Sequence, residues 1–159
     1  MAKDKIEIDS PNSTVSFSVK KLGLLTVKGQ ISDFDGEIEF DKEDLDSSSF
    51  NVSIGASTID TGNQKRDEHL KSKDFFFVKE HPKISFISTS IVEKEGKYQV
   101  KGNLTMLETT KEVSIPFTFI NKVFSGEFSL NRKDYKLGAK FPALIVAKTI
   151  QISINCKIK

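Results

Sequence analysis

Apolar and polar residues alternate with a period of two along most of this 159-residue chain. The last run is the clearest, because Ile150, Ile152, Ile154, Cys156 and Ile158 are each separated by one polar residue. Successive side chains of a β-strand point to opposite faces, so such a run places its apolar residues on one face. Repeated along the chain, this alternation is typical of an antiparallel sheet with one face in water. An all-β fold is therefore expected.

Nine segments show the alternation or a related β-rich pattern: 15–19, 25–31, 38–40, 50–54, 84–91, 98–102, 113–119, 124–130 and 150–158. Turn signals separate several of them, at Asp35-Gly36, Glu95-Gly96 and Asn121-Lys122. Eight or more strands in one domain form either a sandwich or a closed barrel. The sequence leaves both open, with the barrel favoured.

Three glycines inside the strand patterns favour the barrel. Gly29, Gly102 and Gly126 interrupt runs of otherwise apolar inward positions. A glycine within a strand often marks a sharp bend or a bulge. Closure of a sheet into a barrel needs such curvature.

One segment, 62–72, lacks the alternation and is predicted to be a short polar helix. Thr61 and Gln64 have the spacing of a capping box, with Thr61 at the N-cap. Three consecutive phenylalanines at 75–77 follow the helix. We expect the helix to cross one end of the barrel and these phenylalanines to anchor it there.

Length and charge limit the classes of protein that this chain can represent. A chain of 159 residues corresponds to a single domain, residues 1–159. No apolar run approaches the roughly 20 residues of a membrane-spanning helix. Lys and Arg total 24 against 22 Asp and Glu, and they are scattered among each other. A net charge of +2 does not require a polyanionic partner, so nucleic-acid binding is not expected.

Candidate catalytic and metal-binding residues are few. Cys156 is the only cysteine and there are two histidines, which are too few ligands for a Cys/His metal site. His69 could act as a general base within the cluster Arg66, Asp67, Glu68 and His69. However, no nucleophile motif accompanies it. The favoured interpretation is structural, with Arg66 and Asp67 tying the helix to a loop; no catalytic residue, metal or cofactor is predicted.

Several ordered motifs resemble those of the YceI-like family of lipid- and polyisoprenoid-binding proteins. The motifs lie at 34–36, 58–61, 66–76, 81–89, 102–105 with 110–111, and 131–135. The resemblance covers nearly the whole chain. It implies an extended, lipocalin-like antiparallel barrel of about eight strands, with the short helix closing one end. It also implies an apolar pore for a long-chain isoprenoid lipid, such as a polyprenyl compound or an isoprenoid quinone, or for a fatty-acid-like ligand.

The family resemblance sets the expected role and partners. We expect lipid binding, with transport or storage of the ligand, transient contact with membranes, and a homodimer as known for the family. Two alternatives remain open: an enzyme or stress-response factor that acts on a bound quinone, and a structural barrel with a filled interior. The first nine residues lack the apolar stretch of a signal peptide, so the expected location is the cytoplasm, or the periplasm if a signal has been removed.

Strand facing predicts which residues line such a pore. The twelve apolar candidates are Phe17, Val19, Val27, Ile38, Val52, Ile54, Phe86, Ile115, Phe117, Phe128, Ile152 and Ile154. Arg132, and after it Arg66, are candidates for binding a polar or anionic head group. Each has a structural alternative, in which Arg132 pairs with Asp134 and Arg66 pairs with Asp67. Periodicity alone does not separate a filled barrel from a hollow one.

Overall fold

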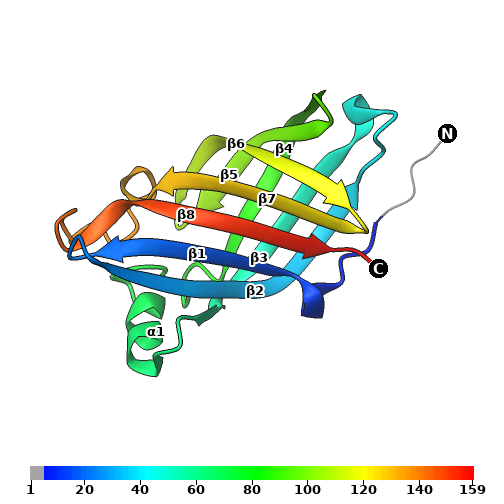
Figure 1. Ribbon diagram of the computed structural model, residues 1–159. Helices are drawn as coiled ribbons and strands as arrows, with labels where there is room; N and C mark the ends of the chain where they lie inside the picture. Colours follow the sequence, from blue (N-terminus) through cyan, green and yellow to red (C-terminus); the bar gives the residue numbers. More distant parts are fainter. Residues whose placement is uncertain (1–5) are drawn as a thin grey trace.

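The computed structural model describes residues 6–159, which form a closed antiparallel barrel of eight strands (Figure 1). Each strand pairs with the next one in sequence, and the last pairs with the first. The strands are β1 (Thr14–Lys21), β2 (Leu25–Glu39), β3 (Ser49–Asp60), β4 (Lys83–Lys94), β5 (Lys97–Met106), β6 (Thr109–Ile120), β7 (Val123–Asn131) and β8 (Val146–Lys157). The predicted all-β barrel is confirmed, and the sandwich alternative is wrong.

The predicted helix is present as α1 (Gln64–Lys71), which lies at the end of the barrel where β1 turns into β2 (Figure 1). Its N-cap is Asn63, whose side chain accepts a hydrogen bond from the amide of Arg66, so the predicted cap at Thr61 is wrong. Short 3₁₀ turns cover Ser10–Asn12 (η1), Leu45–Ser47 (η2) and Arg132–Tyr135 (η3). No helix among the described residues is long and apolar enough to cross a bilayer.

Strand β2 runs through a site where the sequence predicts a turn. Asp35-Gly36 lies inside β2, where the pairing register with β3 shifts between Ser32 and Asp35. Asp33 and Gly36 have positive φ angles of 65° and 128° there. These are the marks of a bulge, which bends the strand without ending it. The Asp-Gly signal therefore indicates curvature at this position, and the predicted turn is wrong.

The other two predicted turns are confirmed. Glu95-Gly96 joins β4 to β5, and Asn121-Lys122 joins β6 to β7. Both residues of each pair have positive φ, between 53° and 79°. Two-residue turns with this backbone match the twist of antiparallel strands.

Two of the strand glycines allow aromatic rings to approach the barrel wall closely. A Cβ atom placed on Gly29 would lie 2.5 Å from the ring of Phe17 on the neighbouring strand β1. One placed on Gly102 would lie 2.6 Å from the ring of Phe86 on β4. Larger residues at these glycines would push both rings away from the wall.

Aromatic side chains fill the barrel at the end that holds the C-terminus. They contact one another with ring centroids 4.2–6.3 Å apart, mostly edge to face. We call this cluster the aromatic plug; its members are Phe40, Phe50, Tyr98, Phe117, Phe119 and Phe124. Bridges from Ile6 to Ile38 and from Ile8 to Ile158 cover the same end. The barrel is therefore packed solid at one end.

Candidate functional site

The opposite half of the barrel encloses an apolar cavity of about 390 Å³. Ten of the twelve apolar candidates line it, together with Arg66 and Arg132. These ten are Phe17, Val19, Val27, Val52, Ile54, Phe86, Ile115, Phe128, Ile152 and Ile154. The barrel is hollow here, so the alternative of an interior filled throughout does not hold.

Ile38 and Phe117 do not line the cavity, and their prediction as pore residues is wrong. Both are buried, but Phe117 packs within the aromatic plug and Ile38 pairs with Phe50 and Ile6. Their side chains face the interior, as alternation predicts. They lie at the packed end because they are further along the barrel axis than the lining residues of the same strands.

Several residues that were not predicted to line the pore also border the cavity. Some continue the same inward stripes, and the alternation could have found them: Val15, Ile31, Ile84, Leu104, Met106, Leu130 and Ile150. Others come from α1 and from irregular segments, where no periodic signal exists: Leu70, Phe75, Phe76, Leu137, Phe141 and Ile145.

The cavity opens at the end that carries α1. Among its lining residues, those classed as exposed are Lys21, His69 and Ile145. Lys21 ends β1, His69 belongs to α1, and Ile145 precedes β8. All other lining residues are buried or half-buried. A mouth therefore lies between the β1–β2 turn, α1 and the loop of residues 136–145, which we call the β7–β8 loop.

Arg132 holds the β7–β8 loop in place. It is only 1% exposed, and its five N–H groups all donate to backbone carbonyls at 2.6–3.1 Å. The acceptors are Leu137, Gly138, Phe141, Val146 and Ala147. Burial lowers the pKa of this guanidinium, but an arginine side chain stays charged at neutral pH.

Arg132 thus has a structural role, but its partners are backbone carbonyls and not the expected carboxylate of Asp134. The predicted pairing with Asp134 is replaced by the five carbonyls, and Asp134 itself is exposed. Since every donor of the guanidinium is engaged, it has none left to offer a ligand head group. The charge nevertheless lies next to the cavity, where carbonyl dipoles compensate it.

Arg66 and Asp67 both bind Thr61, the residue after β3. Arg66 Nε donates to Thr61 Oγ1 and Nη2 donates to the Thr61 carbonyl, each at 2.8 Å. The Thr61 amide and hydroxyl donate to Asp67 Oδ1 at 2.9 and 2.6 Å. The two charged residues therefore tie α1 to the end of β3, as the structural interpretation predicts, through Thr61.

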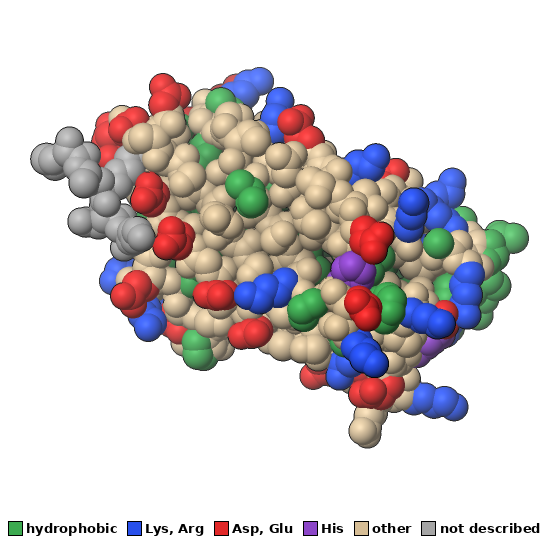
Figure 2. Space-filling model, turned by 180° about the vertical axis from the view of Figure 1, so that it is seen from behind, with side chains coloured by type: hydrophobic (Ala, Val, Ile, Leu, Met, Phe, Trp, Pro, Cys, Tyr) green, Lys and Arg blue, Asp and Glu red, His purple; other side chains and the backbone are tan. Residues whose placement is uncertain are grey.

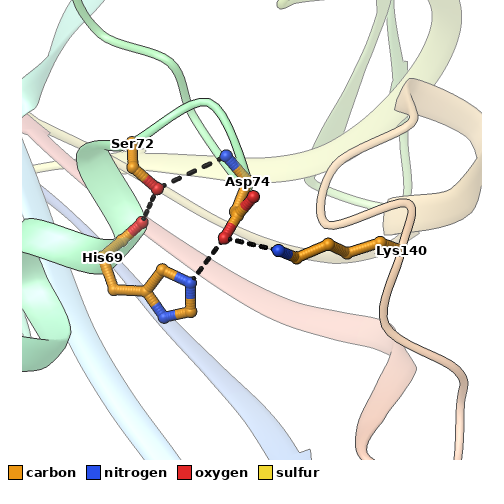
Figure 3. A network of polar contacts seen from close by, with 4 residues as sticks. All are labelled: His69, Ser72, Asp74 and Lys140. Carbon is orange, nitrogen blue, oxygen red and sulfur yellow. Dashed lines mark hydrogen bonds and ion pairs between the residues drawn. The ribbon is translucent and has the colours of Figure 1, made fainter.

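A polar network joins α1 to the β7–β8 loop across the mouth (Figure 3). His69 Nε2 lies 2.9 Å from Asp74 Oδ2, and Lys140 Nζ lies 2.9 Å from the same oxygen. Two hydrogen bonds hold the pKa of Asp74 below its ordinary value. The one from Lys140 has the larger effect and the one from His69 the smaller. The rings of Phe75 and Phe141 stack 5.1 Å apart beside this network. His69 thus has a partner that explains its place without catalysis.

Cys156 shows no sign of reactivity, and the described residues form no metal-binding cluster. Cys156 is buried on β8 opposite Phe124 of the aromatic plug, and burial raises the pKa of its thiol to about 11. A thiol with so high a pKa is protonated and unreactive at neutral pH. Within residues 6–159, no three His, Cys, Asp or Glu side chains gather as a metal site would require.

Comparison with solved structures supports the barrel and its proportions. The crystal structure of BcnA from Burkholderia cenocepacia superposes with a TM-score of 0.87 at 25% identity, covering 94% of this chain and 98% of that one. A polyisoprenoid-binding domain from Saccharophagus degradans superposes with a TM-score of 0.70 at 11% identity, covering 99% of both chains. At 11% identity, the second similarity concerns the fold alone.

Sequence comparison places the chain in a family. UPF0312 protein ECA1782 from Pectobacterium atrosepticum is 30% identical over 146 residues, which are 86% of this chain and 76% of the relative. The model of the YceI-like domain matches residues 7–158, nearly the whole chain. The resemblance noted in the sequence motifs is confirmed, and this chain belongs to the YceI-like family.

Proposed function

We propose that this protein binds the apolar chain of a lipid in its barrel and carries or stores it. The observation behind this proposal is the cavity of about 390 Å³, which has an apolar lining and reaches the surface at one end. An apolar cavity favours apolar groups, because burying an unpaired charge there is costly. The name of the Saccharophagus domain, which has the same fold, supports an isoprenoid as the ligand class.

The size of the cavity restricts how a long lipid could bind. A volume of about 390 Å³ lies near the lower end of the range for sites that hold drug-sized ligands, roughly 300–1,000 Å³. A polyprenyl chain or the tail of an isoprenoid quinone would therefore enter with one part, and the rest would remain at the mouth. A fatty-acid-like ligand would fit more completely.

Energetics favour a reversible carrier. Each buried CH₂ group gains about 0.8 kcal/mol relative to water. A long-chain lipid, however, comes from a bilayer that is as apolar as the cavity. Most of the transfer free energy therefore cancels, and the ligand can exchange in both directions between the barrel and a membrane.

The first test is native mass spectrometry of protein purified without detergent, with extraction and identification of bound lipid. Geranylgeraniol and oleic acid, added in turn, serve as defined ligands if the purified protein is empty. We expect a stoichiometric complex, lost in Ile152→Arg because the charge would enter the cavity unpaired. Ile87→Arg adds the same charge on the exposed outer face of β4 and should bind normally.

A variant that fills the cavity keeps the test independent of charge. Ile115→Phe adds volume to a buried lining position and should lower the amount of ligand taken up. Wild-type protein that neither retains a lipid nor takes up either added ligand would refute the proposal. Equal binding by the wild type and the folded Ile152→Arg variant would show that the ligand lies elsewhere.

A further inference from the structure

Exposed apolar side chains gather at the end of the barrel where the cavity opens. Of the eight large hydrophobic residues that are exposed among residues 6–159, five belong to the β1–β2 turn, the first position of β2 and the end of the β7–β8 loop. They are Leu22, Leu24, Leu25, Leu144 and Ile145, with exposures from 38% to 88%. We call these five residues the apolar rim. In Figure 2, hydrophobic side chains cluster at the right-hand end of the molecule, beside Lys and Arg side chains.

The two segments of the apolar rim form one surface. The amide of Leu22 donates to the carbonyl of Ile145 at 3.0 Å, and Lys21 pairs with Val146 across the β1–β8 ladder. Ile145 belongs both to the rim and to the cavity lining. The rim is therefore continuous with the mouth, and a ligand that enters the cavity passes beside it.

The charged residues in the two segments that carry the apolar rim all have the same sign. Residues 20–26 and 136–148 contain Lys20, Lys21, Lys136, Lys140 and Lys148, and no Asp or Glu. The whole chain has a net charge of only +2, so the remainder of the protein is net acidic. One of these lysines, Lys140, is bound to Asp74. The other four belong to the same two segments as the exposed leucines, and those segments contain no carboxylate.

Exposed leucines in segments that carry lysines and no carboxylates match a particular partner. Peripheral proteins bind an anionic bilayer by inserting apolar side chains below the head groups, while flanking lysines contact the head groups. An exposed apolar patch is otherwise a liability for a protein in water. We propose that the apolar rim docks this protein on the surface of an anionic lipid bilayer, with the mouth of the cavity facing the membrane.

This inference rests on the proposed function, because docking brings the mouth to the source of the ligand. A lipid could then move from bilayer to cavity without its chain crossing water. The rim and the cavity are nevertheless separable, since Leu22, Leu24, Leu25 and Leu144 do not line the cavity. Membrane docking and ligand binding can therefore be tested by different variants.

The experiment is flotation of the protein with vesicles of phosphatidylcholine alone or mixed with phosphatidylglycerol. Wild-type protein should float with the mixed vesicles, more strongly at low salt because salt screens the lysines. The double variant Leu24→Ser/Leu144→Ser should bind them about tenfold more weakly or worse, since two apolar side chains no longer insert. Ile120→Ser, on a residue 65% exposed at the β6–β7 turn, is the matched control and should bind as wild type.

A second measurement separates failure of docking from failure of ligand binding. Fluorescence of N-phenyl-1-naphthylamine reports uptake into the cavity without vesicles, and it should be the same in wild type and Leu24→Ser/Leu144→Ser. If the wild type floats but takes up neither this probe nor geranylgeraniol nor oleic acid, the proposed function is wrong and docking stands.

Three results would overturn the docking proposal. One is wild-type protein that does not bind the mixed vesicles. Another is equal flotation of the wild type and the folded double variant. The third is a concentration-dependent dimer of the wild type that the double variant lacks, which would show that a second copy of the chain covers the rim.

Discussion

The two ends of this barrel are stabilised in different ways. At the closed end, six aromatic side chains of the plug fill the interior and contact one another directly. At the open end the interior is hollow, and the surrounding segments are held by polar groups. Arg132 binds five carbonyls there, and Asp74 joins Lys140 to His69.

The difference shows how a small barrel can keep a cavity. Apolar packing stabilises a structure only where side chains fill the space, so it is weak around a void. Hydrogen bonds from a buried guanidinium can fix a loop from the side and leave the interior empty. Directed polar contacts therefore stabilise the open end, whereas apolar packing stabilises the closed end.

The largest expected effect is the loss of the Arg132 contacts. Arg132→Met leaves five backbone carbonyls without their donors, and we expect it to lower the free energy of unfolding by about 3–5 kcal/mol. Arg132→Lys keeps the charge but offers fewer donors, and should lose less. Urea denaturation measures both. A change below about 1 kcal/mol in Arg132→Met would show that the open end does not depend on these bonds.

A pair of phenylalanine variants compares the two ends directly. Phe117→Ala removes a ring from the plug and should cost about 3–5 kcal/mol of stability. Phe128→Ala removes a ring that borders the cavity and should cost about half as much, because that ring already lacks partners on one side. Uptake of oleic acid should change in Phe128→Ala and stay unchanged in Phe117→Ala. Equal stability losses in the two variants would contradict the distinction between the ends.

The smallest effect concerns pH and the contact between α1 and the β7–β8 loop. Because Lys140 and His69 lower the pKa of Asp74, their contribution to stability is present at neutral pH. It is lost as the pH falls through that lowered pKa, which lies below the ordinary value of 3.8. We therefore expect Asp74→Asn to be less stable than wild type at pH 7 and equally stable in strong acid.

Thermal unfolding of wild type and Asp74→Asn across this pH range measures the difference. Lys140→Met removes the larger cause of the shift but keeps the contact with His69, so it should show the same pattern with a smaller amplitude. A difference between wild type and Asp74→Asn that persists in strong acid would mean that the variant disturbs something other than this ion pair.

The sequence predicted the walls of the barrel better than its ends. Alternation reports which face of a strand a side chain occupies, so residues such as Val52 and Ile115 were placed correctly in the interior. It does not report depth along the barrel axis. Phe117 has the same facing as Ile115 but lies two residues further along β6, within the plug. That is why two of the twelve pore predictions failed.

The structures at the open end depend on contacts that no local pattern encodes. Arg132 binds carbonyls of residues 137–147, and their positions follow from the path of the whole β7–β8 loop. Asp35-Gly36 has the composition of a turn, but pairing of β2 with β3 on both sides converts it to a bulge. The motif around Arg132 identified the family, yet it gave no indication of which atoms the guanidinium contacts.

The aromatic plug makes the barrel a tube with a dead end. A chain that enters through the mouth must stop at the plug, and it must leave by the way it came. The distance from the mouth to the plug therefore limits the length of a chain that the cavity can enclose. It would also fix the orientation of a bound ligand, because the end that enters last would stay at the mouth and leave first.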